Sequence, residues 1–446
     1  MGRIGKHVVM RSALAAAFSL LAATAAWAQL PPNANTGALV AAAGGNPQLS
    51  ATAAYVGHVC PNLPVGSDLR LRCAWMLRVA APTPDQARLG LDMNTPQEVI
   101  AQGATVDGAV SPASGAVAGR LSALTRLGGV GRVASAYRPI VLAAQGDTAG
   151  LGGASVPRLQ GFANVVAGAG DRDRDTYEAG YDFDQRSITA GMDYRFSDTF
   201  TGGVALSYGD TDADFDNDGG GGKLEAQAVV GTVYGLWNVN DRLQVTGLVS
   251  YGRIDFSSDR RIFYTEDPGV VIDRVANADT EGDQWEATLT FTYLMAGADG
   301  WSYGPSLALS GRTLDLDAFT ETGAQGLNLT FGKQSAESFQ VILGFDVSKA
   351  ISTQTGVVSP YGRVQTVYET LDNRRNILVR YAADTTGFFP GVRLTTNAPD
   401  RWRFVVGGGV AGQFAGGWSA FADAEAVLGL RHTTAVTATL GVRKEF

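Results

Sequence analysis

Few side chains in this chain could perform catalysis. Its 446 residues include three histidines, and only His58 and His432 follow the N-terminal apolar segment. A Ser–His–acid nucleophile system needs a histidine with a serine and a carboxylate placed beside it. His58 lies two residues before a cysteine, where a surface position is expected, and His432 lies in a predicted turn between strands. We therefore predict no catalytic residues and no enzymatic activity.

An acidic run is the strongest candidate for metal binding. In "GDTDADFDNDGG" (209–220), aspartates occupy every second position from Asp210 to Asp218. Calcium loops use similar spacing because several side-chain oxygens must surround a hard cation. The glutamate that such loops carry at their twelfth position is missing, and long extracellular loops are commonly acidic. We favour a solvated loop here and predict neither a metal site nor a cofactor.

The two cysteines, Cys60 and Cys73, are interpreted from the compartment that the N-terminus implies. Basic residues precede an apolar run over 13–27, and "AWA" supplies small residues before a cut after Ala28. This arrangement is typical of a Sec signal peptide, which we assign to residues 1–28. Exported proteins meet an oxidising environment, so we predict a Cys60–Cys73 disulfide.

The chain after the signal peptide divides into two parts of different composition. Residues 29–135 are rich in Ala, Pro and Gly, and only short stretches such as "GAVAGRLSALTRL" (115–127) have helical spacing. We predict a small, partly helical region here, stabilised by the disulfide. The Gly-rich residues 136–157 are predicted to be a linker or a segment inside a pore, and "RLSALTRL" (120–127) is the alternative for the pore segment.

From residue 158 to residue 446, apolar residues recur at every second position. We count twelve such segments, beginning near residues 159, 180, 199, 224, 242, 283, 301, 338, 357, 402, 418 and 434. A soluble β-sandwich alternates in the same way. However, the turns after the second, fourth, sixth and tenth segments are short, and the connections after the third, fifth, seventh and ninth are long and polar. These lengths predict an all-β fold, a twelve-stranded antiparallel transmembrane β-barrel over residues 158–446.

The alternation also assigns side chains to the two faces of the predicted barrel. The charged residues expected to line the pore are Asp193, Arg195, Glu225, Glu286, Arg363, Arg403, Asp423, Glu425, Arg431 and Arg443. The residues expected to form an aromatic girdle near the short turns are Tyr194, Phe196, Trp237, Trp301 and Trp418. The residues of the last strand expected to face lipid are Val436, Leu440, Val442 and Phe446. Outer-membrane lipids and lipopolysaccharide are the partners that such a surface implies.

Charge and hydropathy limit the remaining possibilities. The net charge is −8 and 17% of the residues are charged, which argues against a nucleic-acid partner. After residue 28 no segment reaches the ~18 apolar residues of a membrane helix. We therefore expect a monomer in the outer membrane of a Gram-negative cell, reached after Sec-dependent export.

Several stretches resemble a known protein family. They are "AGYDFDQRSITAGMDYRFSDTFTGGVALSYGDTDADF", "SPYGRVQTVYE", "GWSAFADAEAVLGLR" and the terminal "LGVRKEF". Through them, residues from about 158 to 446 resemble the autotransporter β-domain, the translocator of type V secretion. The resemblance implies a twelve-stranded barrel that exports an N-terminal passenger, with periplasmic chaperones and the barrel-assembly machinery acting during biogenesis.

The resemblance also gives the last strand a role. It implies that Val436, Leu440, Val442 and Phe446 belong to the insertion signal read by the barrel-assembly machinery. The chain departs from the family at Lys444, where an aromatic residue is frequent. A lysine near the interface can extend its ammonium group into water, so we expect a modest effect.

Together these patterns predict a translocator that exports or displays its own short N-terminal region by folding around a chain segment in its pore. Some family members cleave themselves at an Asn-Asn step, and the sequence contains no such pair, so the region is expected to stay attached. The alternative is a passive outer-membrane pore or a surface-loop adhesin whose N-terminal region stays in the periplasm. Hydrolase and protease passengers are much longer than residues 29–157, which argues against an enzyme.

Overall fold

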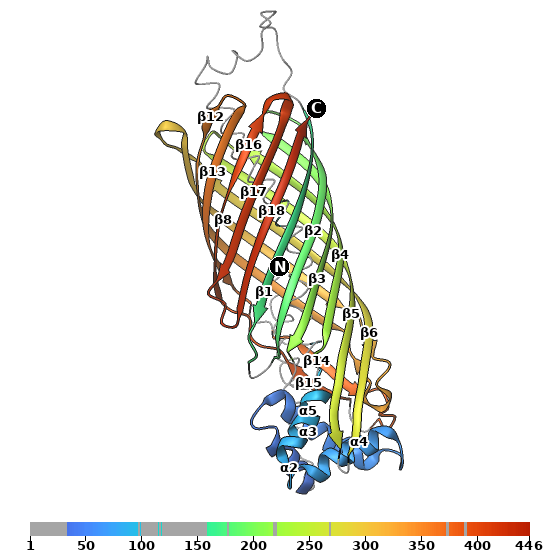
Figure 1. Cartoon of the computed structure of the whole chain (residues 1–446). Coiled ribbons are helices and arrows are strands. Elements are labelled where there is room, and N and C mark those ends of the chain that lie inside the picture. Colours follow the sequence, from blue (N-terminus) through green and yellow to red (C-terminus); the bar gives the residue numbers. More distant parts are fainter. Residues whose placement is uncertain are drawn as a thin grey trace, which may run out of the picture.

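The structure is a computed structural model, and it describes residues 34–96, 99, 115, 117, 158–175, 178–216, 221–266, 269–371, 374–387 and 390–446. The assigned signal peptide (1–28) and both alternatives for the pore segment, 136–157 and 120–127, lie outside these residues. Figure 1 shows a tall barrel of tilted strands with a group of helices at one end.

Twelve long strands close the barrel, as the sequence predicts. They are β1 (Leu159–Arg172), β2 (Gly180–Arg195), β3 (Phe200–Asp216), β4 (Lys223–Asn238), β5 (Leu243–Glu266), β6 (Val270–Tyr293), β8 (Trp301–Leu316), β11 (Gln334–Lys349), β13 (Gly356–Glu369), β16 (Trp402–Phe414), β17 (Trp418–Leu428) and β18 (Thr433–Glu445). Each pairs antiparallel with the next, and β1 pairs with β18 from Gln160↔Glu445 to Arg172↔Thr433. The closure leaves no strand edge in the lipid region, where water could not satisfy unpaired backbone groups.

The two ends of the barrel differ in their connections. At one end, the short-turn end, the strands are joined by residues 196–199, 239–242, 294–300, 350–355 and 415–417, which include β7 (Met295–Ala296), η3 (Ala298–Gly300), β12 (Ile351–Thr353) and η5 (Ala415–Gly417). At the opposite, long-loop end lie the extended connections 317–333 and 370–401. In the 298–300 turn, Asp299 has a φ of 53°, so a tight left-handed bend reverses the chain there.

The strands extend further at the long-loop end than the sequence analysis expected. Most of the polar stretch between residues 264 and 282 is strand and not loop, because β5 and β6 continue pairing up to Glu266↔Val270. The acidic run from Asp210 to Asp216 likewise belongs to β3. These segments keep a period of two, with mainly apolar residues facing inward and most charged residues facing outward; Arg260 and Glu266 are inward-facing exceptions. They form strands that project beyond the lipid region.

The two long connections build a second, smaller sheet. Its strands are β9 (Phe319–Thr320) and β10 (Leu329–Phe331) from the first connection, and β14 (Asn376–Tyr381) and β15 (Val392–Thr395) from the second. Their order is β15-β14-β10-β9, and η4 (Gln325–Leu327) lies between β9 and β10. We call this four-stranded unit the loop sheet.

Residues 34–96 form four helices, which we call the helical cap. They are α2 (Ala34–Ala42), α3 (Pro47–Val59), α4 (Asp68–Val79) and α5 (Pro84–Asn94), with η2 (Cys60–Asn62) after α3. Asn46 caps α3 by accepting hydrogen bonds from the backbone of Gln48 and Leu49, and Pro47 begins the helix. The Cys60–Cys73 disulfide joins the end of α3 to α4 across a Cα–Cα distance of 5.9 Å. No helix in the described ranges is long and apolar enough to cross a membrane.

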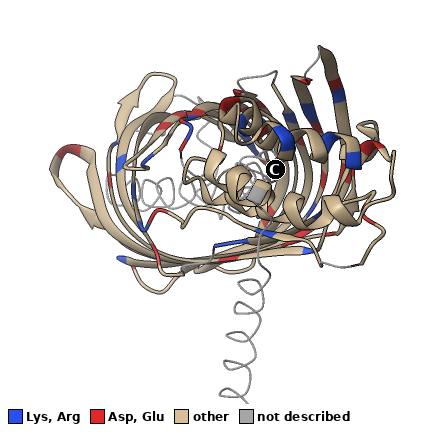
Figure 2. Ribbon diagram, turned by 90° about the horizontal axis from the view of Figure 1, so that it is seen from below, with Lys and Arg blue, Asp and Glu red and all other residues tan. Residues whose placement is uncertain are grey.

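The cap and the long-loop end share one hydrophobic core. It contains cap residues such as Leu39, Leu69 and Met76 together with Ile262 and Phe331 from the barrel side, all with at most 1% of their surface exposed. Figure 2, viewed from the helical end, shows the helices lying over part of the barrel opening. Gly90 of α5 lets the helix approach α4 closely, because an added Cβ would lie 2.9 Å from the Trp75 ring.

Candidate functional site

The outer surface of the barrel carries two aromatic zones. At the short-turn end, exposed fractions of 38–62% are found for Tyr194, Phe196, Trp237, Trp301 and Trp418, which places all five on the outside where the girdle was expected. Sequence reasoning missed a second zone toward the long-loop end. There Tyr251 packs on Trp285 and Tyr368 on Trp402, with ring centroids 4.9 and 4.5 Å apart. The two zones bound an apolar outer band, as the two interfaces of a membrane require.

Beyond the second aromatic zone, toward the long-loop end, the outer surface of the barrel becomes charged. Asp210, Asp212 and Asp214 lie on the outer face of β3, and Asp212 and Asp214 face Asp184 and Asp182 of β2 in register. The predicted solvated loop is therefore an acidic strand surface, and Asp218 lies outside the described residues. In the part of the chain that the structure covers, no three His, Cys, Asp or Glu side chains are placed to hold a metal ion.

Eight of the ten predicted pore-lining residues lie on the inward faces of their strands: Asp193, Arg195, Glu286, Arg363, Arg403, Asp423, Glu425 and Arg443. Several of them are paired with a group of opposite charge or with an amide. Arg363 donates to Asp423 at 2.7 Å and also contacts Glu425, and Arg403 donates to Gln340 at 2.9 Å. The strand wall from β13 to β18 therefore presents a compact, mixed-charge surface to the lumen.

Two of the pore-lining predictions are wrong. Glu225 is exposed on the outer face of β4, whereas its neighbours Leu224 and Ala226 are fully buried on the inner face. Between the lipid region and the long-loop end, the inner face of the strands is mainly apolar and the outer face is polar. A charged residue there is therefore not evidence that the side chain faces the lumen. Arg431 lies in the turn between β17 and β18, where its largely exposed side chain pairs with Asp400 at 2.5 Å.

The lumen wall from β2 to β8 changes character along its length. Toward the short-turn end, hydroxyl groups pair across strands, as between Thr189 and Ser207 at 2.8 Å and between Thr232 and Ser250 at 2.9 Å. Toward the long-loop end the wall is apolar, and its buried residues are Ala179, Tyr181, Ala213, Phe215, Leu224, Ala226, Ala228, Val230, Ile254, Phe256, Leu314 and Leu316. A chain inside this barrel would meet hydroxyl groups toward the short-turn end and a continuous apolar wall toward the long-loop end.

One residue upstream of the barrel lies inside it. Val117 is fully buried against inward-facing residues of β1, β3, β4 and β5, among them Phe162, Tyr234 and Leu248. Phe162 is the fourth residue of β1, so this contact lies in the half of the lumen nearest the short turns. Val117 therefore lies inside the lumen near the short-turn end, whereas the cap lies at the long-loop end.

The cap is joined to the barrel by a buried arginine. Arg260 of β5 donates from Nε and Nη2 to Glu321 of the first long connection, at 2.9 and 2.6 Å. Its Nη1 donates to the backbone carbonyl of Met93 in α5 at 2.9 Å, and Nη2 also reaches the carbonyl of Leu327 at 3.0 Å. The Arg260 side chain thus contacts the first long connection and the cap as well as belonging to the β5–β6 hairpin.

Two further ion pairs join the cap to β5 and β6. In one the cap supplies the acidic residue, and in the other it supplies the basic residue. Asp68 of α4 accepts from Arg274 of β6 at 2.6 and 2.8 Å and from the backbone of Gly326 at 3.0 Å. The hydrogen bonds from Arg274 hold the pKa of Asp68 below its usual range, although partial burial opposes them. Arg72 of the same helix donates to Glu266 at 2.6 Å. Burial raises the pKa of Glu266, and the charge of Arg72 opposes that rise.

Aromatic side chains complete the contact. The Tyr55 hydroxyl of α3 donates to Asp384 at 3.1 Å and accepts from the Tyr381 backbone at 3.2 Å, and the two tyrosine rings stack at 5.7 Å. Burial raises the pKa of Tyr55, so the phenol stays protonated and able to donate. On the other side of the cap, Trp75 stacks on Tyr264 of β5 at 5.0 Å.

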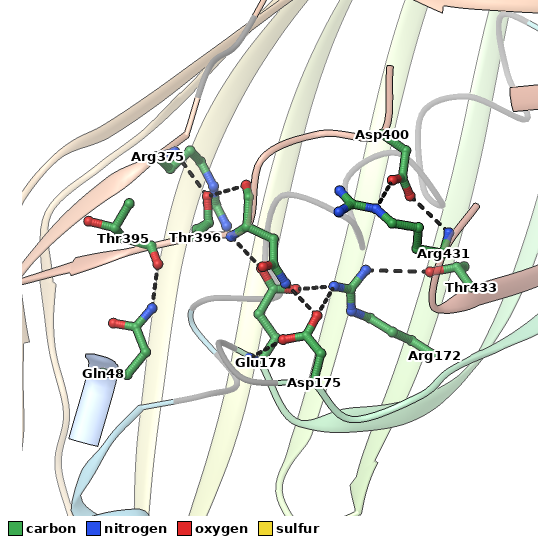
Figure 3. Close-up of polar contacts among 11 residues, drawn as sticks. Gln48, Arg172, Asp175, Glu178, Arg375, Thr395, Thr396, Asp400, Arg431 and Thr433 are labelled. Atoms are coloured by element: carbon green, nitrogen blue, oxygen red, sulfur yellow. Dashed lines mark hydrogen bonds and ion pairs between the residues drawn. The ribbon is translucent and has the colours of Figure 1, made fainter. Parts of the chain in front are cut away.

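The second long connection, residues 370–401, also reaches the β1–β18 junction (Figure 3). Its Asn397 donates to Asp175 and Glu178 of the β1–β2 connection at 2.5 and 3.0 Å. Both carboxylates pair with Arg172 at 3.1 and 2.8 Å. Arg172 also donates to Thr433 of β18 at 3.4 Å. The connection therefore ties the cap to the strands that close the barrel, because Gln48 of α3 donates to the carbonyl of Thr395.

The last strand lies with its apolar side outward. Val436, Leu440, Val442 and Phe446 are 52–70% exposed on the outer surface. The Phe446 backbone donates to the carbonyl of Leu159 at 3.1 Å, which extends the β1–β18 pairing to the final residue. Lys444 donates to the carbonyl of Gly416 at 2.5 Å and lies over the Trp418 ring, so its ammonium group reaches the polar turn.

Comparisons with known proteins agree with this geometry. Residues 161–425 match the family description "Autotransporter beta-domain". "Outer membrane protein A" of Rickettsia rickettsii is 28% identical over 185 residues, which cover 41% of this chain and 8% of that protein. The protein of the same name from Rickettsia conorii is 27% identical over 185 residues, covering 41% of this chain and 9% of its own length. The chain thus spans less than a tenth of these curated relatives.

A solved structure shows the same fold. The translocator domain of autotransporter NalP from Neisseria meningitidis superposes with a TM-score of 0.50 at 16% sequence identity. The match covers 65% of this chain and 89% of that one. At this level of identity the likeness concerns the architecture of the barrel.

Proposed function

This chain belongs to the autotransporter β-domain family, and we propose that its barrel carries the chain's own N-terminal region across the outer membrane and displays it there as the helical cap. The protein is an outer-membrane β-barrel of a translocator type.

The orientation follows from the connections. Outer-membrane barrels have short periplasmic turns and longer extracellular loops. With that rule, the long-loop end faces outward, and the cap that packs on residues 317–333 and 370–401 lies on the cell surface. Leu159, the first residue of β1, lies at the opposite end, because it pairs with Tyr194 next to the 196–199 turn.

The observation that supports export most strongly is the position of Val117. The cap ends near residue 96 at the long-loop end, and β1 begins at the short-turn end, so the chain between them has to pass from one end to the other. Val117 is buried among inward-facing residues of four strands. A path through the lumen accounts for both facts.

The lumen offers suitable chemistry for such a segment. Serine and threonine hydroxyls and charged groups of both signs can hydrogen-bond backbone groups that would otherwise lose their partners inside the barrel. Mixed charges bind no single sign of substrate strongly, which fits a passage for polypeptide better than an ion-selective channel. In this proposal the cap stays attached, because the chain remains continuous through the pore.

An epitope test in intact cells decides between export and periplasmic retention. The epitope is inserted after Val65, which is 88% exposed in the connection between α3 and α4. A matched insertion after Asp299, in a short turn, reports the periplasmic side. We expect antibody to bind the first epitope in intact cells and the second only after the outer membrane is permeabilised. If the Val65 epitope also needs permeabilisation, the N-terminal region is periplasmic and the protein is a pore or loop adhesin.

A further inference from the structure

We infer that the long-loop end of the barrel is a docking receptor for the helical cap: the cap completes its fold only on this surface, and docking makes its passage one-way. The inference rests on the proposed function and adds what captures the exported segment. The receptor consists of the projecting β5–β6 hairpin (residues 260–278) and the loop sheet, and we call it the loop platform.

The core supports this because it is divided between the two partners. On the cap side, Leu39, Leu49, Leu69, Met76 and Leu91 have at most 2% of their surface exposed. On the platform side the residues buried to the same extent include Ile262, Tyr264, Leu327, Leu329, Phe331, Ile377, Val379, Tyr381 and Leu394. A unit of the cap's size is only marginally stable on its own core, so it depends on further support beside the Cys60–Cys73 disulfide. Here the support comes from side chains that belong to the barrel.

The polar contacts select one register of docking. Along α4 the cap presents a carboxylate and a guanidinium at Asp68 and Arg72, and the platform presents the opposite charges at Arg274 and Glu266. A shift of the helix by one turn would bring Arg72 to Arg274 and leave Glu266 unpaired. Like charges in contact are unfavourable and limit wrong arrangements. Complementary charges of both signs therefore make the surface specific for this helix in this direction.

Buried hydrogen bonds make the receptor incomplete without its ligand. Without the cap, Arg260 would lose the Met93 carbonyl and the Tyr381 backbone would lose the Tyr55 hydroxyl. Tyr264 would lose the Trp75 ring that stacks on it, and the platform's share of the common core would be uncovered. A large apolar surface of this kind marks an interaction site, and the occupant seated on it is residues 34–96 of the same chain.

Docking gives the export step a direction. A segment that emerges unfolded gains its stable contacts only at the outer end of the barrel, and anything that binds one state shifts the equilibrium toward it. Sliding back would require the shared core and the crossing ion pairs to separate. Capture on the platform thus retains the exported segment without a further energy source.

Two adjacent residues on opposite faces of β5 provide the test. Ile262 has none of its surface exposed and packs in the shared core, whereas Phe263 is 38% exposed on the outer face. Ile262→Asn and Phe263→Asn place the same polar group on each face. Full-length protein without the epitope is purified in detergent, and the rate at which proteinase K cleaves within residues 34–96 is measured by mass spectrometry. Barrel integrity is followed by heat-dependent migration in SDS gels.

Ile262→Asn is expected to speed cleavage within the cap at least about tenfold while the barrel stays folded, because a buried amide and a lost apolar contact open the cap. Phe263→Asn is expected to leave the rate unchanged. A cap that resists digestion in Ile262→Asn folds independently, and the receptor inference is then wrong. This assay needs no export, so it is independent of the intact-cell labelling that tests display.

Discussion

At the scale of single residues, Arg260 shows how the chain's own helical cap is held over the barrel opening. The side-chain exposures of Arg260 and Glu321 are 4% and 3%, so this pair is withdrawn from water. Removing one partner of such a pair leaves a buried charge and costs about 3–5 kcal/mol. Because the same guanidinium also holds Met93, a loss here would loosen the cap and the loop sheet together.

The carboxylates of the interface make its pH dependence predictable. The lowered pKa of Asp68 means that its contribution is complete above its ordinary value of 3.8 and is lost as the pH falls through the depressed value. The raised pKa of Glu266 has the opposite sign, because the folded state then binds a proton more tightly than the unfolded chain and gains stability as the pH falls. The cap should therefore stay docked at pH 5 and loosen only below 3.8.

Hydrogen exchange of α4 amides, corrected for intrinsic rates, measures this opening. The expected profile is flat between pH 7 and pH 5, with faster opening only in stronger acid. Asp68→Asn should open more readily at neutral pH and should lose the acid-dependent step. An opening that already accelerates near pH 6 would show that another group controls the contact.

At the scale of elements, we expect the last strand to determine how efficiently the barrel is assembled in the outer membrane. We propose that Val436, Leu440, Val442 and Phe446 act as the insertion signal read by the barrel-assembly machinery. The Phe446 ring lies over Gly161, where an added Cβ would approach it to 3.5 Å, so the final residue also covers the junction with β1. Phe446→Ser should lower the fraction of folded, heat-modifiable barrel in outer membranes severalfold.

Phe200→Ser is the matched control for that change. Phe200 is 42% exposed in the same aromatic zone and is not part of the terminal strand. It loses a comparable apolar contact with lipid, and it should reduce the folded fraction only slightly. Equal losses for the two variants would mean that Phe446 contributes only its lipid contact.

The elements also show what period-two patterning can and cannot predict. Alternation identified all twelve strands, because lipid outside and a polar wall inside select opposite residue types. It misassigned Glu225 because the environment reverses above the lipid region, where Leu224 packs inward and the outer face meets water. The cap helices were not found, because α3 buries residues such as Thr52, Tyr55 and Gly57 around much of its circumference and shows no single apolar stripe.

At the scale of the whole molecule, the capped mouth could not be predicted from the sequence. Its contacts join residues far apart in the chain, as in Arg72 to Glu266, separated by 194 positions, and Tyr55 to Asp384, separated by 329. Local patterns contain no information about such pairings. The Cys60–Cys73 disulfide was predictable because it depends on only two residues and on the compartment that the N-terminus implies.

In the proposed function one chain is both cargo and carrier. The outer zones would set the position of the barrel in the membrane, the lumen would be the passage, and the platform would receive the segment that emerges. Each level depends on the one before it, since the platform is built on strands that must first insert. The central claim is that the chain passes through its own lumen between the cap and β1.

Photocrosslinking from position 117 tests that claim most directly. A diazirine amino acid replaces Val117, cells are irradiated, and the cross-linked peptides of the full-length protein are identified by mass spectrometry. The account predicts intramolecular links to β1, β3, β4 and β5, the strands that surround Val117. Links to periplasmic proteins, or none to the barrel strands, would contradict it.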